Sequence, residues 1–250
     1  MRFSPHAVDL LRRRCEAEST RSFNARGITL KRCEFCQLGL KTCICEWRKA
    51  RCSELQFVLI MHRDEVYKPT NTGRLIADVF PHQCQAFLWN RTQPDEALLA
   101  LLNDRNRHCQ LVFPAGEQEL REVHHRPLKP QTVNAPINTI VLLDGTWKQA
   151  RKMYSQAKWM KHLPLLDLSS TLKNSEQDWG NYRVRQACEE GQLATAEAAA
   201  LALAANREIR ASEHLLNYFS VFNEHYVATR ANTQPRPLPA HQYLTEIDTH

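Results

Sequence analysis

Residues 138–150 read NTIVLLDGTWKQA, and this stretch decides the fold class. The continuous apolar run at 138–143 contains β-branched residues, which is typical of a strand buried on both faces of a parallel sheet. Thr146 can cap a helix that we expect to run to about Ala157. A buried strand followed at once by a helix is the repeating unit of α/β domains.

The same alternation extends in both directions along the chain. Short apolar runs predict further strands at 56–61, 84–89, 109–113 and 163–168. Capping residues and helical periodicity predict further helices at 70–80, 94–107 and 195–222. We expect a loop over 114–136 and an irregular tail after residue 230. The sequence therefore predicts an α/β fold with a mainly parallel sheet, whose ligands bind at the carboxyl ends of the strands.

Composition excludes several classes of protein. The 250 residues include only 7 glycines and contain neither a G-x-x-x-x-G-K loop nor a G-x-G-x-x-G turn, so a nucleotide-like cofactor must be held in another way. No apolar run approaches the roughly 20 residues needed to cross a bilayer, so we expect no membrane partner. The N-terminal residues lack the apolar stretch of a signal peptide, and we therefore expect a cytoplasmic protein.

The excess positive charge lies at the N-terminus. Residues 1–52 hold 12 basic and 5 acidic side chains, whereas residues 53–250 hold 21 and 22. A basic segment joined to a near-neutral body favours a nucleic-acid partner, and a solvated tail that only aids solubility is the alternative. Lys68 and Arg74 flank a helix start, which predicts either an anion site or a well-capped helix with two surface cations. The predicted RNA contacts are Arg12, Arg13, Arg14, Lys31, Arg32, Lys68 and Arg74.

Four of the nine cysteines form the pattern C-x2-C-x6-C-x-C. Two tight pairs on a short loop can place four thiolates at the corners of a tetrahedron, which suits Zn²⁺. A group of buried structural thiols is the alternative. Because four protein ligands leave no position for water, we expect a structural zinc site rather than a catalytic one. Its predicted ligands are Cys33, Cys36, Cys43 and Cys45.

Asp144 follows the apolar strand directly and stands at the start of a helix. Partial burial favours proton acceptance by a carboxylate in such a position, which suits a general base. The alternative is an ordinary helix cap with Trp147 packed in the core. The phosphatase motif D-x-D-x-T does not fit, because Thr146 stands where that motif has its second acid.

These motifs resemble the DTW-domain family, which is named for the pattern D-x-T-W found here at 144–147. The resemblance covers residues 30 to about 220 and includes the cysteine cluster, KPTNTGRL at 68–75, FP at 113–114, YRVR at 182–185 and ATAEAAALAL at 194–203. It implies a tRNA-uridine aminocarboxypropyltransferase. Such an enzyme moves the 3-amino-3-carboxypropyl group of S-adenosylmethionine (SAM) to N3 of a uridine in the tRNA variable loop and releases methylthioadenosine.

The resemblance also implies a SPOUT-like architecture with a C-terminal trefoil knot that holds SAM. We expect a basic segment with the zinc module over residues 1–52, the catalytic domain over 53–230 and the tail over 231–250. Asp144 is the expected base for uridine N3, Trp147 a stacking surface, and Arg183 or Arg185 the partner of the SAM carboxylate or of a phosphate. The residues expected around SAM are Phe113, Pro114, Asp144, Thr146, Trp147, Arg183 and Thr195.

Two other functions stay open. The first is a SPOUT-type RNA methyltransferase, because methyl and aminocarboxypropyl transfer both use SAM and differ only in which carbon of the sulfonium faces the nucleophile. The second is a non-catalytic, zinc-containing RNA-binding module in which D-x-T-W only caps a helix. A monomer is favoured over a dimer formed through the alanine-rich helix.

Overall fold

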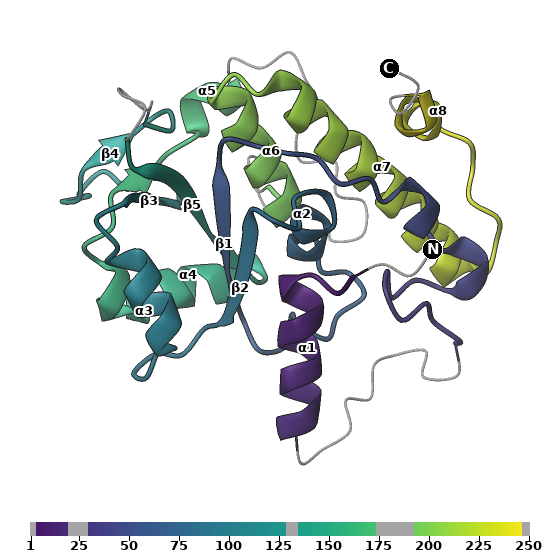
Figure 1. Ribbon diagram of the computed structural model, residues 1–250, viewed down its shortest axis with the longest axis horizontal. Helices are drawn as coiled ribbons and strands as arrows, with labels where there is room; N and C mark the ends of the chain where they lie inside the picture. Colours follow the sequence, from purple (N-terminus) through teal and green to yellow (C-terminus); the bar gives the residue numbers. More distant parts are fainter. Residues whose placement is uncertain (1–3, 20–29, 129–134, 174–192, 247–250) are drawn as a thin grey trace.

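The structure is a computed structural model that describes residues 4–19, 30–128, 135–173 and 193–246. Its described residues form one sheet of six strands, all parallel, in the order β2–β1–β5–β3–β6–β4 (Figure 1). The strands are β1 Gln56–Met61, β2 Cys84–Leu88, β3 Arg107–Val112, β4 Val123–His124, β5 Ile137–Asp144 and β6 Leu165–Leu166. The predicted α/β class with a parallel sheet is confirmed.

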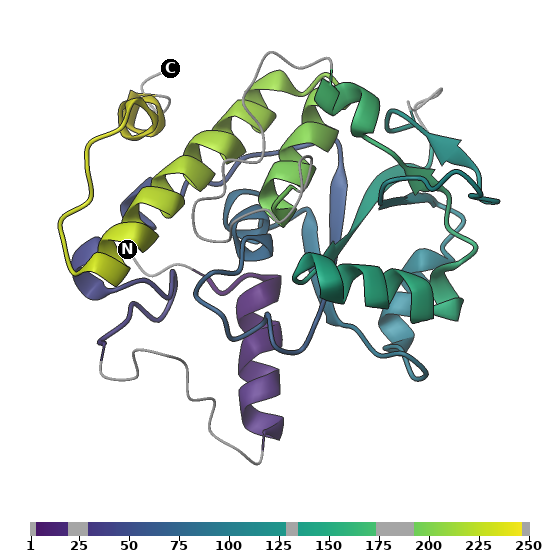
Figure 2. The same ribbon diagram turned by 180° about the vertical axis from the view of Figure 1, so that it is seen from behind.

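Successive side chains of a strand point to opposite faces of the sheet, and both faces are buried. Along β5, Ile140 and Leu142 join one apolar cluster, whereas Val141 and Leu143 join the other. Two helices cover the second face, α3 Glu96–Leu102 and α4 Trp147–Gln156. The helices of the first face are α1 Ala7–Glu18, α2 Gly73–Val79, α6 Thr195–Ala205 and α7 Ile209–Ala231 (Figure 2).

The central position of β5 gathers four strand exits at one edge of the sheet. β5 pairs with β1 on one side and with β3 on the other, and β3 in turn pairs with β6. Because all of these strands are parallel, their carboxyl ends lie together. The segments that follow these strands therefore meet at the edge where α/β sheets bind ligands.

The predicted helix over 195–222 is wrong as a single element. It is two helices, because α6 ends at Ala205 and α7 begins at Ile209. Arg207 between them has a φ of 69°, in the left-handed region, and the Glu208 N–H closes the end of α6 on the Leu203 carbonyl at 2.9 Å. Such a left-handed residue is a common helix terminator.

Three other expectations also need correction. The tail after residue 230 contains α8 Pro239–Glu246, which buries Ala240 and Leu244 in the main core. Pro239 suits the first position of this helix, since its fixed φ fits and no N–H is needed there. The predicted loop over 114–136 contains the short strand β4, and α3 ends at Leu102 rather than at residue 107. A further helix, α5 Ser169–Lys173, follows β6.

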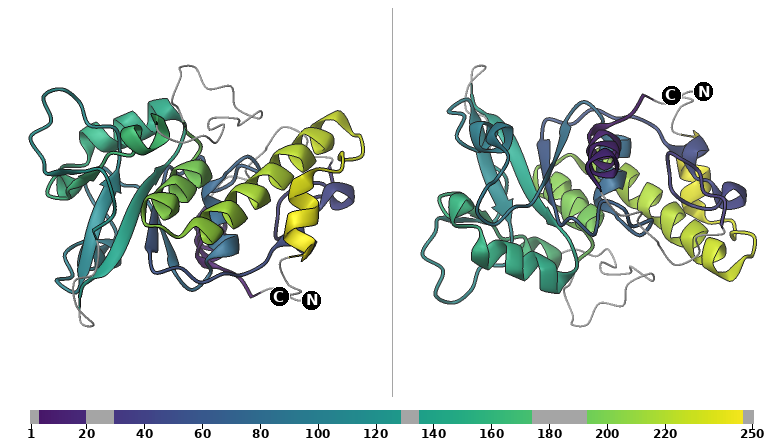
Figure 3. Two further views of the ribbon diagram at one scale, coloured as in Figure 1. Left: turned by 90° about the horizontal axis from the view of Figure 1, so that it is seen from above. Right: turned by 90° about the horizontal axis from the view of Figure 1, so that it is seen from below.

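The main core runs across the predicted domain boundary at residue 52. Leu38 and Ile44 of the cysteine loop are fully buried in the same cluster as Phe57 of β1. The cysteine loop and α8 lie at one end of the molecule, and α3 and β4 at the other (Figure 3). The expected knot depends on the path of residues 174–192, which lie outside the described residues, so it stays a prediction. No helix in the described parts of the chain is long and apolar enough to cross a membrane.

Candidate active site

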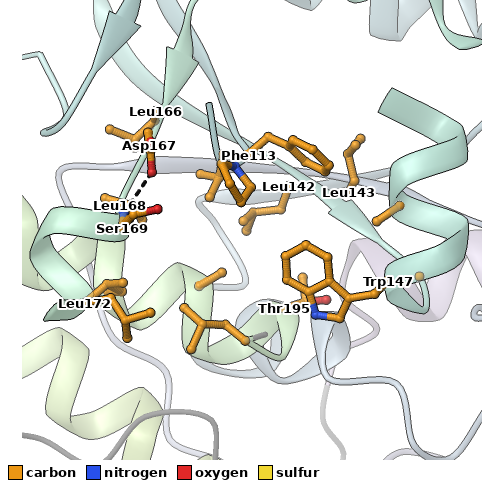
Figure 4. A pocket seen from close by; sticks show the side chains of 17 residues that line it. Phe113, Leu142, Leu143, Trp147, Leu166, Asp167, Leu168, Ser169, Leu172 and Thr195 are labelled. Carbon is orange, nitrogen blue, oxygen red and sulfur yellow. Dashed lines mark hydrogen bonds between the residues drawn. The ribbon is translucent and has the colours of Figure 1, made fainter. Parts of the chain in front are cut away.

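A pocket lies at the carboxyl edge of the sheet, and four separate chain segments line it. Phe113 and Pro114 come from the exit of β3, and Gly145 and Trp147 from the junction of β5 with α4. The segment from β6 into α5 and the start of α6 complete the wall (Figure 4). The lining residues of those two segments include Asp167, Leu168, Ser169, Leu172, Leu193, Thr195, Ala198 and Leu201.

Aromatic side chains form one wall of this pocket. The Phe113 ring stacks on Tyr154 of α4 with ring centroids 4.0 Å apart, and the Trp147 ring lies 6.4 Å from Phe113. Tyr154 is fixed in turn by Glu119, whose carboxylate accepts its hydroxyl at 2.5 Å. Burial and this carboxylate raise the pKa of Tyr154 to about 12, so its ring keeps a neutral hydroxyl. An ordered aromatic wall suits a flat heterocycle.

Asp144 lies behind the pocket wall rather than on it. It is only 2% exposed and does not line the pocket. Oδ2 accepts a hydrogen bond from the Asn71 amide, and Oδ1 accepts one from the Thr195 hydroxyl at 2.6 Å. Both bonds favour the ionised carboxylate. Because Thr195 does line the pocket, its hydroxyl connects the buried carboxylate to the space where a ligand fits.

Close backbone approach of α2 holds Asp144 on its other side. A Cβ atom at Gly73, the first residue of α2, would lie 2.9 Å from the Asp144 carboxylate. Only glycine fits such an approach. The side chain of Asn71 caps this helix by accepting the Arg74 N–H at 2.8 Å while its amide group donates to Asp144. The N-cap position itself is Thr72, whose side chain makes no cap hydrogen bond, so Asn71 supplies the cap from one residue earlier.

Thr146 is placed differently from its neighbours. Its side chain caps α4 in a capping box with Gln149, and it does not line the pocket. Phe113, Pro114, Trp147 and Thr195 do line it. Arg183 and Arg185 lie outside the described residues.

A second acid, Asp167, lies at the exit of β6 on the pocket wall. It accepts hydrogen bonds from the Ser169 N–H at 2.9 Å and from the Ala115 N–H at 3.2 Å. Burial alone would raise the pKa of Asp167, but these hydrogen bonds outweigh it and the pKa is lowered. The pocket therefore presents one ionised carboxylate at this exit. Asp167 was not predicted from the sequence, although it follows an apolar strand in the same way as Asp144.

The four clustered cysteines have the geometry of a metal site. Their sulfur atoms all lie within 4.8 Å of one another, with 3.6 Å between Cys33 and Cys45 and 3.7 Å between Cys36 and Cys43. Tetrahedral zinc with Zn–S bonds of about 2.3 Å places its sulfur ligands about 3.8 Å apart. The contact with the Cys45 thiol lowers the pKa of Cys36 to about 5, and burial raises the pKa of Cys43 to about 11. The cluster can bind a metal ion such as zinc.

The relationship of this chain to known families follows from one match. The profile of the DTW domain matches residues 30–227, which includes the cysteine loop, α2, the pocket and most of α7. The chain belongs to the DTW domain family. No solved structure gives a significant match to it. Membership of the DTW domain family is consistent with a tRNA-modifying role.

Two of the predicted RNA contacts of this DTW-family protein are buried. Arg12 is 9% exposed and donates to the Glu34 carbonyl, and Arg74 is 3% exposed and donates to the Phe35 carbonyl. Both hold the cysteine loop in place. Because both side chains are buried, these two arginines are poorly placed to contact RNA.

Asp78 is the centre of the ion-pair network that contains Arg74. Its carboxylate pairs with His6 at 3.1 Å, with Arg48 at 2.9 Å and with Arg74 at 3.7 Å, and it accepts the Tyr218 hydroxyl at 3.2 Å. Burial opposes ionisation, but hydrogen bonding from His6 and the nearby positive charges outweigh it and lower the pKa of Asp78 to about 2. Asp78 thus connects α1, which precedes the DTW domain, to the cysteine loop, α2 and α7 within it.

Proposed function

We propose that this protein transfers the 3-amino-3-carboxypropyl group of SAM to N3 of a uridine in tRNA and releases methylthioadenosine. The observation that carries the proposal is the meeting of two family motifs at one pocket. Trp147 belongs to D-x-T-W and Thr195 to the motif that begins at Ala194, and both line the pocket although they lie far apart in the chain. The bond between Thr195 and Asp144 joins the same two motifs.

The pocket residues fit SAM by their chemistry. The aromatic wall of Phe113 and Trp147 suits an adenine or a uracil ring. Asp167 offers a carboxylate whose remaining lone pairs suit ribose hydroxyls or an ammonium group. When bound, SAM supplies an electrophilic carbon on a sulfonium whose departure as a neutral thioether needs no general acid. The chain must therefore supply orientation and one base.

Asp144 is the proposed base, acting through Thr195. In this step the Thr195 oxygen accepts the proton of uridine N3 while its own hydroxyl proton moves to Asp144 Oδ1, 2.6 Å away. The nitrogen lone pair is then free to attack the carbon of the transferred group. The Asn71 amide holds the second oxygen of Asp144 and so fixes the carboxylate toward Thr195. Asp144 never needs to reach the pocket itself.

Zinc has a structural place in this proposal. Cys33, Cys36, Cys43 and Cys45 would hold it, and four sulfur ligands leave no position for water or substrate. The loop packs on α7, where the His225 ring contacts the Thr42 carbonyl at 3.0 Å. A metal here would fix the loop against the core rather than take part in transfer.

The by-product distinguishes the proposed reaction from its alternatives. Purified protein, tRNA and SAM are incubated, and the small molecules are separated by chromatography. Methylthioadenosine formed only in the presence of tRNA supports the proposal. Formation of S-adenosylhomocysteine would instead identify an RNA methyltransferase. If neither product forms, the protein is better explained as a non-catalytic RNA-binding module. A reaction without protein controls for the spontaneous breakdown of SAM.

A further inference from the structure

The second half of the chain carries a strongly basic surface that lies beside the pocket. Between Asp144 and Asp167 the sequence contains no acidic residue. Its basic residues lie on α4 and on the short helix η3 Lys158–Met160 that follows, with Lys161 just beyond. We call the exposed ones the α4 basic face: Lys148, Arg151, Lys152, Lys158 and Lys161. Figure 2 shows α4 on the outside of the molecule, with no other helix in front of it.

Within the protein, this arrangement of charges is unfavourable. Lys148 lies three residues from Arg151 and four from Lys152, so their positive charges share one side of α4 and repel each other. Lys148 also lies in the first turn of α4, where the helix dipole disfavours a cation and where no acidic residue is present. An anionic partner would relieve both effects.

The lysines of this face have no counter-charge among the residues that the structure describes. Lys148, Lys152, Lys158 and Lys161 form no ion pair with any residue in the described ranges. Of the seven RNA contacts predicted from the sequence, Arg13 and Lys31 are also exposed and form no ion pair with a described residue, but the other five behave differently. Besides the two buried arginines, Arg14 pairs with Asp95 at 3.7 Å, Lys68 pairs with Glu65 at 2.8 Å, and Arg32 donates to the Gln37 carbonyl at 2.9 Å.

The pocket and the α4 basic face share the start of α4. Trp147, which lines the pocket, is the residue before Lys148. Gln149, one turn before Lys152 and Met153, bonds to His62 at the exit of β1, so the start of α4 is fixed at the carboxyl edge of the sheet. A chain of phosphates lying along this face would therefore bring a neighbouring nucleotide to the aromatic wall.

We infer that the α4 basic face binds the phosphate backbone of the substrate tRNA and positions the target nucleotide at the pocket. The inference deepens the proposed function and rests on it. It assigns the main RNA contact to the middle of the chain and not to the basic N-terminal segment. The partner is RNA because the cations lie along a helix and the short helix after it, which matches a run of phosphates.

Charge reversal tests this inference against the N-terminal segment. One variant carries Lys148→Glu and Lys152→Glu; the matched variant carries Arg13→Glu and Lys31→Glu, two exposed residues of the N-terminal segment, with the same change in net charge. Binding of fluorescently labelled tRNA is measured by anisotropy over a series of salt concentrations. We expect the α4 variant to bind at least about tenfold more weakly, with a salt slope reduced by about 0.7 to 0.9 for each phosphate that it no longer neutralises. The matched variant should change affinity by less than about threefold.

Stability and SAM binding keep the result interpretable. Lys148→Glu agrees with the helix dipole in the first turn of α4, and the two new carboxylates repel each other as the two lysines did, so the α4 variant should melt close to the parent protein. SAM affinity, measured by calorimetry, should be unchanged in both variants. The inference would be overturned if the two variants bound tRNA equally well, or if the matched variant lost more affinity. In that case, aminocarboxypropyl transfer by the parent protein would still support the proposed function. Conversely, the α4 variant could lose tRNA affinity selectively while the parent protein shows no transfer. This result would support the tRNA-binding surface and reject the proposed reaction.

Discussion

The Thr195 hydroxyl donates to Asp144 Oδ1 at 2.6 Å, and this bond joins the end of β5 to the start of α6 across 51 residues of sequence. It gives the buried carboxylate a route to the pocket. Whether Asp144 acts as a base or only as an anchor for α6 depends on the protons in this bond, so the bond can be tested by substitution.

Asp144→Asn should reduce transfer by about 100- to 10,000-fold, as expected for loss of a general base. The new amide can donate to the Thr195 oxygen while its carbonyl still accepts from Asn71, so the fold should persist. Transfer rates are measured at saturating SAM and tRNA, with melting temperature as the control for folding. The variant should regain rate as pH rises, because uridine then ionises without help. Near-normal turnover would assign Asp144 a structural role.

Thr195→Val should show the same loss if the hydroxyl carries the proton. Valine keeps the shape of threonine but cannot exchange protons with Asp144. Thr195→Ser is the matched control, since it keeps the hydroxyl and should retain most of the rate. If valine and serine variants are equally active, the transfer of the proton through Thr195 is wrong.

Gly73→Ala should lower both stability and activity. Alanine raises helix propensity by about 1 kcal/mol, which alone would stabilise α2. Its methyl group, however, would lie 2.9 Å from the Asp144 carboxylate and would displace it from Asn71 and Thr195. Gly116→Ala provides the control, because nothing lies within 4 Å of a Cβ there. Thermal unfolding and transfer rate are compared for the two variants; a Gly73→Ala protein more stable than the parent would show that the close approach is unimportant.

Much of the fold follows from local sequence pattern, whereas the site depends on contacts that pattern does not encode. The apolar run of β5, followed at once by α4, predicted the parallel sheet, because a strand that is apolar on both faces must be covered by helices on both sides. The break between α6 and α7 escaped prediction because Arg207 adopts a left-handed conformation without a glycine. Asn71 was not predicted as a site residue, because its bond to Asp144 spans 73 residues. α8 was missed because its burial depends on packing against α7 and the distant cysteine loop.

Metal analysis tests the cysteine site. Purified protein should contain about one zinc ion per chain. Cys43→Ser should lose the metal to a chelator more readily and should unfold at a lower temperature. Cys52→Ser is the matched control, because Cys52 is exposed and lies outside the cluster. The zinc site would be contradicted if the purified parent protein contained no metal and if added zinc left its melting temperature unchanged.

The network around Asp78 predicts how stability depends on pH. Its pKa is lowered from 3.8 to about 2 in the folded state. Because the folded pKa lies below the unfolded one, the stabilisation is present above pH 4 and is lost as pH falls toward 2. A shift of this size corresponds to about 2 kcal/mol. Urea unfolding between pH 2 and 5 should therefore show a falling free energy of unfolding, and Asp78→Asn should flatten this dependence. If the free energy of unfolding of the variant fell equally steeply with pH, the pH dependence would arise from other carboxylates.

Deleting the N-terminal segment is a poor test of RNA binding. Val8, Leu11 and Cys15 of α1 are buried in the main core, and His6 pairs with Asp78. Removal of residues 1–28 should therefore unfold part of the protein. If such a deletion abolished tRNA binding, the cause would be loss of folded structure rather than loss of RNA contacts. Circular dichroism at rising temperature would then show a lower melting temperature for the deletion variant.

The central claim is the identity of the transferred group, and double labelling measures it most directly. tRNA is incubated with the protein and with SAM labelled either in its carboxyl carbon or in its methyl carbon, and the tRNA is then precipitated and counted. Our account predicts that the carboxyl label enters the tRNA, that the methyl label stays in methylthioadenosine, and that the labelled nucleoside is a uridine modified at N3. Methyl label in the tRNA without carboxyl label, or no label in the tRNA at all, would contradict it.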